Sequence, residues 1–188
     1  IVMSVLKQSS KLTVTALMVA VGISGPAWAD SAVVDDLFEQ LQDADPSDWS
    51  RIEGQIYEQW SKSGSPTIDL LVRRGGEAIE AGDFAAAVEH FTAAIDHDPT
   101  FAEAYNGRAT AYYLMNQIGP SLDDIRETLV LNPRHFGAMS GFAVILEELD
   151  RPKEALEVYE QILDLVPAAT NVQEAIERLK LDLEGQTL

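Results

Sequence analysis

The chain has 188 residues, of which 46% are hydrophobic and 23% charged, a composition typical of a folded globular protein. It contains no cysteine, which excludes disulfide bonds, thiol catalysis and metal sites with cysteine ligands. With 13 Lys and Arg against 31 Asp and Glu, the net charge of −18 argues against binding to nucleic acid or to anionic lipid.

The first 29 residues differ in composition from the rest of the chain. Lys7 and Lys11 are the only charged residues before Asp30. An apolar run over residues 12–23 follows the lysines, and the sequence Ala-Trp-Ala directly precedes Asp30. This order predicts a secretory signal peptide over residues 1–29, cleaved after Ala29, and therefore a periplasmic protein of a Gram-negative bacterium. The apolar run is shorter than the roughly 20 residues of a membrane-spanning helix, which favours a cleaved leader over an anchor.

Residues 30–66 contain two short amphipathic segments. Apolar residues at positions 34, 37, 38 and 41 share one face of a first helix. Ile52, Ile56 and Trp60 line a second helix, for which Asp45 or Ser47 is a candidate N-cap. The pair is expected to be either a degenerate repeat or an N-terminal cap on the repeats that follow, and we favour the cap.

Three prolines, Pro99, Pro133 and Pro167, recur every 34 residues and divide the chain into blocks 68–101, 102–135 and 136–169. Small and large residues keep the same places before each proline. The small position holds Ala87, Ser121 and Ala155, and the large position holds Phe91, Ile125 and Tyr159. A third equivalent position holds Ala94, Thr128 and Ile162. Their helical spacing predicts two antiparallel helices per block, each second helix ending at the proline. Turns are expected at 82–84, 116–118 and 150–152, where Gly or Asn can adopt the left-handed conformation that ends a helix.

The pattern over residues 68–167 resembles the tetratricopeptide repeat (TPR) family. The best match is the Ala-x3-Phe motif of Ala87 and Phe91, followed by Pro99. The second block has a typical first helix but departs later, at residues 119–121 and at Thr128, and Arg108 stands where the family usually has Leu. The resemblance implies an all-α solenoid, with three TPR hairpins over residues 67–169.

Residues 170–188 form the last predicted element. Asn171 is a candidate N-cap with Glu174 three residues later, the spacing of a capping box. The apolar stripe that follows contains Val172, Ala175, Ile176, Leu179 and Leu183. A solenoid needs a terminal helix with one polar face, so this segment is expected to cap the repeats.

The sequence contains no motif for enzymatic chemistry. A phosphate-binding loop, a Gly-x-Ser-x-Gly elbow and a His-Glu-x-x-His motif are all absent from it. Gly75 and Gly76 fall inside a predicted helix, which indicates close packing. Residues 96–98, Asp-His-Asp, are more typical of a solvated turn than of a metal site. We therefore predict a protein that is not an enzyme and that has no metal or cofactor.

The resemblance to TPR proteins implies that the first helix of each block lines a concave groove. The residues it places there are Asp69, Val72, Ile79, Glu103, Asn106, Thr110, Tyr113, Ser140, Val144 and Glu147, together with Gly76 and Gly137. The apolar members would expose hydrophobic surface without a ligand, and the acidic members would favour a basic segment. The alternative is that these residues pack against neighbouring helices. Some TPR domains use Lys, Arg and Asn residues in the groove to clamp a C-terminal carboxylate. In this chain only Asn106 and Arg73 resemble those residues.

These features predict an exported adaptor or scaffold that binds another protein or peptide in its groove. The expected partner segment is basic or apolar, and neither nucleic acid nor membrane insertion after cleavage is expected. The alternative is a structural subunit of an envelope complex that associates with itself through its repeats.

Overall fold

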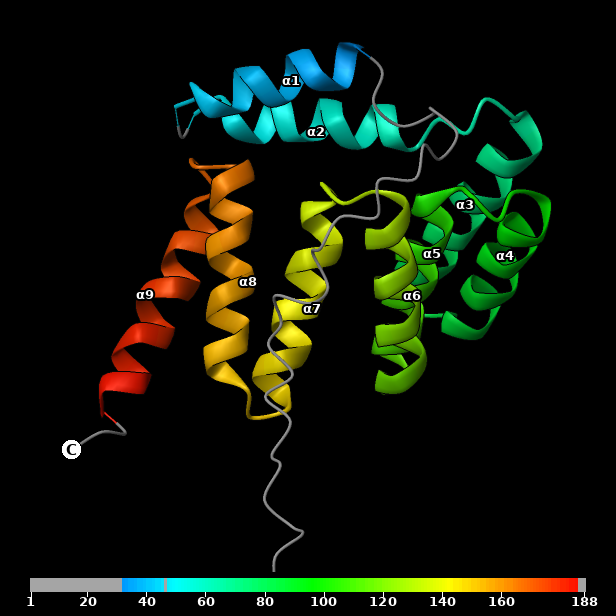
Figure 1. Cartoon of the computed structure of the whole chain (residues 1–188). Helices are drawn as coiled ribbons and strands as arrows, with labels where there is room; N and C mark the ends of the chain where they lie inside the picture. The colour runs from blue at the N-terminus through cyan, green and yellow to red at the C-terminus, as the bar shows by residue number, and fades with distance from the viewer. Residues whose placement is uncertain (1–31, 46, 186–188) are drawn as a thin grey trace, which may run out of the picture.

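A computed structural model describes residues 32–45 and 47–185, which form nine α-helices and no strand (Figure 1). The predicted leader, residues 1–29, lies outside the described residues. The helices are α1 (Ala32–Gln42), α2 (Trp49–Trp60), α3 (Pro66–Glu80), α4 (Phe84–His97), α5 (Ala102–Leu114), α6 (Ile118–Leu131), α7 (Phe136–Glu148), α8 (Pro152–Leu165) and α9 (Thr170–Gly185). None of these helices is both long enough and apolar enough to cross a membrane.

Helices α3 to α8 form three hairpins, one in each of the 34-residue blocks, and the all-α TPR solenoid is confirmed. The residues predicted to share the apolar stripe of each second helix are buried, including the polar Ser121 and Thr128. Each hairpin turn contains one residue with positive φ, namely Gly82 (75°), Asn116 (58°) and Asp150 (58°). The helix before each turn therefore ends in the left-handed conformation that the sequence predicts.

A close approach of three helices explains two glycines in the first repeats. The ring of Phe91 on α4 lies between Gly75 on α3 and Gly107 on α5. A Cβ atom at Gly75 would lie 2.6 Å from the Phe91 ring, and one at Gly107 would lie 2.3 Å from it. Only hydrogen fits at these two positions, so the predicted packing role of Gly75 has a direct geometric cause.

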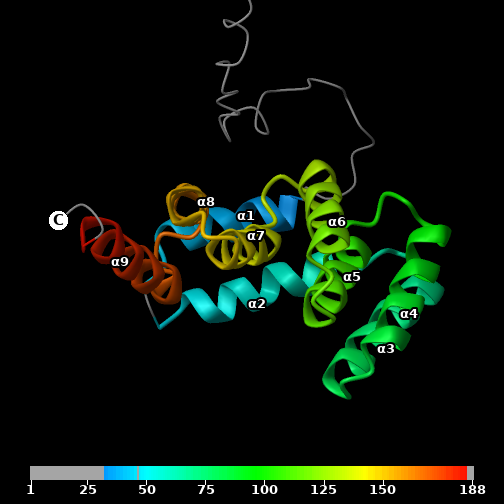
Figure 2. The ribbon, with the colours of Figure 1, turned by 90° about the horizontal axis from the view of Figure 1, so that it is seen from below.

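Helices α1 and α2 form as the sequence predicts, but they do not stack on α3. They lie across the ends of α7 and α8 at the far side of the solenoid (Figures 1 and 2), and α1 contacts α8. One apolar cluster joins residues of α1 and α2 to residues of α7, α8 and α9. This position differs from that of a repeat or a cap preceding α3.

Aromatic packing explains where the N-terminal pair lies. Trp60 stacks on His135 with ring centroids 4.7 Å apart, and Tyr57 meets Phe136 edge-on at 5.2 Å. Phe38 of α1 meets the same Phe136 ring at 6.2 Å. These rings bury apolar area at the start of α7 and so hold the N-terminal pair there.

Polar contacts fix the outer edge of the same interface. Arg134 donates to the Asp35 carboxylate at 2.7 Å, and its guanidinium lies 4.3 Å from the centre of the Phe38 ring. The Gln42 amide donates to the carbonyls of Asp164 (3.2 Å) and Leu165 (3.1 Å). Because the last carbonyls of a helix have no partner within it, Gln42 in effect caps α8.

Helix α9 extends the solenoid beyond the third repeat. Val172, Ile176 and Leu179 are buried against α8, as the predicted stripe requires. The helix begins at Thr170, one residue before the predicted start, so Asn171 lies in its first turn and is not its N-cap.

Candidate functional site

Five of the residues predicted for the groove line a single pocket between the second and third repeats. Helix α5 contributes Asn106, Thr110 and Tyr113, and α7 contributes Gly137 and Val144. The pocket has a volume of about 190 Å³. Its remaining lining residues are Ala109, Ser121, Ile125, Ala138, Gly141 and Ile145.

The pocket exists because α7 presents glycines toward α5 and α6. Gly137 and Gly141 lie one helical turn apart on the same face of α7. The Tyr57 hydroxyl occupies the space beside Gly137, whereas the space beside Gly141 stays open. The Cδ1 atom of Ile125, on α6, lies 3.8 Å from the position that a Cβ atom of Gly141 would take. The Ser121 hydroxyl already donates to the Ala109 carbonyl at 2.9 Å, so it is satisfied within the protein. The walls are consequently mostly apolar.

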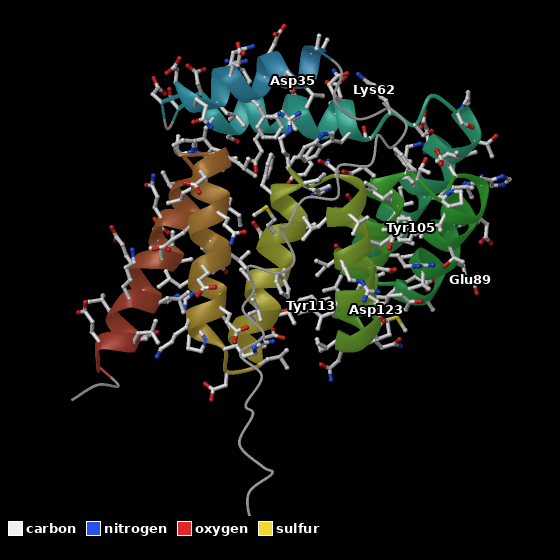
Figure 3. The ribbon with its side chains drawn as sticks, viewed as in Figure 1. Asp35, Lys62, Glu89, Tyr105, Tyr113 and Asp123 are labelled. Atoms are coloured by element: carbon white, nitrogen blue, oxygen red, sulfur yellow. The ribbon has the colours of Figure 1, made fainter. Side chains whose placement is uncertain are left out.

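A carboxylate lies at the end of the pocket nearer the helix C-termini. The Tyr113 hydroxyl donates to the Glu148 carboxylate at 2.5 Å and so links α5 to α7. Figure 3 shows Tyr113 in the space beside α7. This hydrogen bond to Glu148 raises the pKa of Tyr113, so the phenol stays protonated and neutral, and the charge of Glu148 is not compensated by it.

A second carboxylate lies toward the N-terminal ends of the same helices. Glu103 of α5 accepts a hydrogen bond from Nε2 of His135 at 2.7 Å. The His135 side chain is completely buried, and its Nδ1 accepts the backbone N–H of Ala138 at 3.0 Å. Because Nδ1 acts as the acceptor, the ring proton is on Nε2, and the neutral ring both caps α7 and orients Glu103.

Two acidic residues predicted for the groove instead make contacts within the protein. Asp69 accepts from the backbone N–H and the hydroxyl of Ser63, at 2.9 and 2.5 Å, and so fixes the start of α3. Glu147 accepts from Arg178 of α9 at 2.7 Å and from the Tyr159 hydroxyl at 2.9 Å. The Arg178 contact, assisted by that of Tyr159, lowers the pKa of Glu147.

Three further predicted groove residues are also used internally. Val72 and Ile79 are half-buried and pack against the cluster that contains Phe91. The Ser140 hydroxyl donates to the Phe136 carbonyl at 2.9 Å. For these positions the structure matches the alternative of packing between neighbouring helices.

Tyr57 of α2 reaches the third repeat at a predicted groove position. A Cβ atom at Gly137 would lie 2.4 Å from the Tyr57 hydroxyl oxygen, so the glycine makes room for this side chain. Burial raises the pKa of Tyr57, as do the nearby carboxylates of Glu53 and Glu103, and the hydroxyl therefore stays protonated. Helix α2 thus covers the N-terminal end of α7.

The sequence reasoning missed most of the pocket lining, notably Gly141, Ile125 and Ile145. The spacing of Gly137 and Gly141, four residues apart, was a usable signal because it places two glycines on one helix face. Within residues 32–45 and 47–185, no three His, Asp or Glu side chains come close enough together to hold a metal ion.

Comparison with known proteins gives consistent matches. The family model for the tetratricopeptide repeat matches residues 78–119. A TPR repeat-containing protein of Rhizobium etli is 39% identical over 153 residues, an alignment that covers 81% of this chain and 75% of that protein. The small glutamine-rich TPR-containing protein 2 of Saccharomyces cerevisiae is 28% identical over 131 residues, but the chain spans only 37% of its length.

Solved structures with the same fold include peptide-bound examples. The first TPR domain of Spaghetti (RPAP3), bound to an HSP90 peptide, superposes with a TM-score of 0.60 at 22% identity over 64% of this chain and 98% of that one. A MamA mutant has a TM-score of 0.52 at 16% identity, over 81% of this chain and 87% of that one. At these identities the likeness establishes the fold.

Proposed function

The chain belongs to the tetratricopeptide repeat (TPR) family, and from this premise we propose that it is a non-catalytic adaptor that binds a polypeptide segment in the groove lined by α3, α5 and α7. The observation that supports this function best is the pocket between α5 and α7. It is preformed and mostly apolar, and it opens among residues that the repeat pattern assigns to the groove.

The composition of the groove favours a basic partner over an acidic one. Arg73 is the cation of α3 that resembles a carboxylate clamp, and it pairs with Glu77 at 2.8 Å. Glu148, which is hydrogen-bonded to the pocket-lining Tyr113, places negative charge beside the pocket. An acidic C-terminal tail would meet repulsion there, whereas a segment with Lys or Arg would be attracted.

Site-specific photo-crosslinking tests this function. A photoreactive residue replaces Asn106 or Val144, which line the pocket, and the crosslinked products are isolated from the native bacterium. Matched controls carry the same residue at Glu89 on α4 or Asp123 on α6, two exposed positions on second helices (Figure 3). We expect one discrete protein adduct at the groove positions and none at the controls.

Two results would contradict this proposal. Equal crosslinking at all four positions would indicate non-specific contact, and adducts at Glu89 or Asp123 alone would place the interface on the second helices. An adduct with a second copy of this chain would support the alternative function, a structural subunit that associates with itself. Light scattering of the purified protein would then show a dimer or a larger assembly.

We also propose that the adaptor acts in the periplasm after removal of residues 1–29. The acid-free leader, with its two lysines, apolar run and Ala-Trp-Ala sequence, supports export. Mass spectrometry of the protein released by osmotic shock should give an N-terminus at Asp30. Recovery of the intact chain from the cytoplasm would contradict the proposed location.

A further inference from the structure

The pocket between α5 and α7 has the size and polarity of a receptor for one aromatic side chain. A cavity of about 150 Å³ lined by apolar side chains can hold a benzene molecule, and this pocket measures about 190 Å³. Among its lining residues, Val144 is 38% exposed, so an apolar side chain of the pocket is open to solvent.

One exposed carboxylate lies beside the pocket and is held by a neutral partner. Glu148 accepts from the phenol of Tyr113, which lines the pocket. Among the ion pairs of the described residues, Glu148 contacts no lysine or arginine. The carboxylate is therefore available to a cation of a ligand. Glu103, by contrast, is 14% exposed and lines a different pocket, beside α2.

A backbone-binding group lies on the same wall. The Asn106 side chain lines the pocket, and its amide makes no hydrogen bond within residues 32–45 and 47–185. An amide with a free donor and a free acceptor can bind the main chain of an extended peptide beside its inserted side chain.

We propose that this pocket is the specificity site of the groove and that it takes an aromatic side chain next to a Lys or Arg in a partner protein. The aromatic ring enters beside Gly141, Asn106 binds the adjacent main chain, and Glu148 binds the neighbouring cation. This inference rests on the proposed function, because it specifies the chemistry of the segment that the groove binds.

Peptide binding to the full-length chain provides the test. The probe is fluorescein-labelled Gly-Lys-Lys-Phe-Lys-Lys-Gly, compared with the same peptide carrying Ala in place of Phe, by fluorescence anisotropy at low salt. Burial of one Phe side chain predicts that the Phe peptide binds about tenfold more tightly or better. Equal affinities for the two peptides, or no detectable binding of either, would overturn the proposal.

Two sets of variants separate the pocket from the neighbouring charge. Gly141→Leu fills the pocket and should reduce the Phe-to-Ala affinity ratio to about one. Gly54→Leu, at an exposed glycine of α2 with no atom near its Cβ position, should preserve this ratio. Glu148→Gln keeps the hydrogen bond from Tyr113 but should weaken both peptides equally. A ratio unchanged by Gly141→Leu would place the aromatic site elsewhere.

The outcome can be distinguished from failure of the adaptor function itself. If the crosslinking at Asn106 and Val144 captures a partner but the Phe peptide shows no preference, the groove binds a segment of other chemistry and only the specificity proposal fails. If neither experiment gives a positive result, both proposals fail.

Discussion

The indole ring of Trp60 lies almost parallel to the buried imidazole of His135, at 25° and with centroids 4.7 Å apart. This contact joins the C-terminal end of α2 to the residue that caps α7. The N-terminal pair therefore packs on the third repeat, although it precedes the first repeat in the sequence. The two ends of the described chain share one apolar cluster as a result.

Truncation of Trp60 should detach the N-terminal pair. Trp60 is 7% exposed and contacts four other rings, so Trp60→Ala should lower the free energy of unfolding by about 3–5 kcal/mol. Urea denaturation followed by circular dichroism measures this loss. Val33→Ala, at a 52% exposed position of α1, is the control and should change stability by less than about 0.5 kcal/mol. Equal effects of the two substitutions would contradict the docking of α2 on α7.

Two neighbouring glycines of α3 should respond to alanine in opposite directions. Gly75→Ala places a methyl group against the Phe91 ring and should destabilise the protein by about 1–3 kcal/mol. Gly76→Ala meets no atom within 4 Å and should stabilise it by up to about 1 kcal/mol, because alanine favours the helix. Thermal and urea unfolding of the pair measure both signs. Loss of stability in both variants, by equal amounts, would argue against the close approach of Phe91.

The repeats could be predicted from the sequence because their structure is local. Prolines spaced by one repeat, such as Pro99 and Pro133, end helices by removing a backbone donor, and residues such as Ala87 and Phe91 must share a face at helical spacing. These constraints act within one block of the chain. The position of α1 and α2 depends on rings that meet only after the solenoid forms, such as Trp60 and Phe136, and no local pattern encodes that meeting.

The groove was predictable only in part, for a related reason. The repeat pattern assigns residues to the inner face, and two of them, Asn106 and Tyr113, line one pocket. The pattern does not show which of these residues bind other side chains of the same protein. Glu147 resembles a free groove acid in the sequence, but Arg178 of α9 and Tyr159 of α8 bind it.

An ion pair replaces the usual apolar contact between the helices of the second repeat. Arg108 donates two hydrogen bonds to Asp124, at 2.7 and 2.8 Å, and a third to Thr92 at 3.1 Å. Asp124→Asn should lower the free energy of unfolding by about 3 kcal/mol, because it leaves the largely buried Arg108 without its counter-charge.

The double replacement distinguishes a stabilising ion pair from a tolerated one. Arg108→Leu combined with Asp124→Leu restores an apolar contact and should be within about 1 kcal/mol of the wild type, since a packed apolar pair commonly matches a buried ion pair. A double-mutant cycle compares the urea unfolding of Arg108→Leu, Asp124→Leu and the double variant with that of the wild type. If the double variant loses as much stability as the sum of the two single variants, the two side chains are not coupled.

The contact between Glu147 and Arg178 should make the docking of α9 depend on pH. Hydrogen bonding to Arg178, and then to Tyr159, lowers the pKa of Glu147 from its ordinary value of 4.5. The folded state therefore favours the carboxylate, so this group contributes stability above about pH 4.5 that is lost as the pH falls through the lowered pKa. The difference in unfolding free energy between the wild type and Glu147→Gln should be larger at pH 7 than at pH about 3, where protonation of the carboxylate begins to remove it. As a control, Glu160→Gln breaks the ion pair of α8 with Lys180 of α9, in which both side chains are half exposed, and should change stability little at either pH. A Glu147→Gln difference that is the same at both pH values would show that the carboxylate charge does not hold α9.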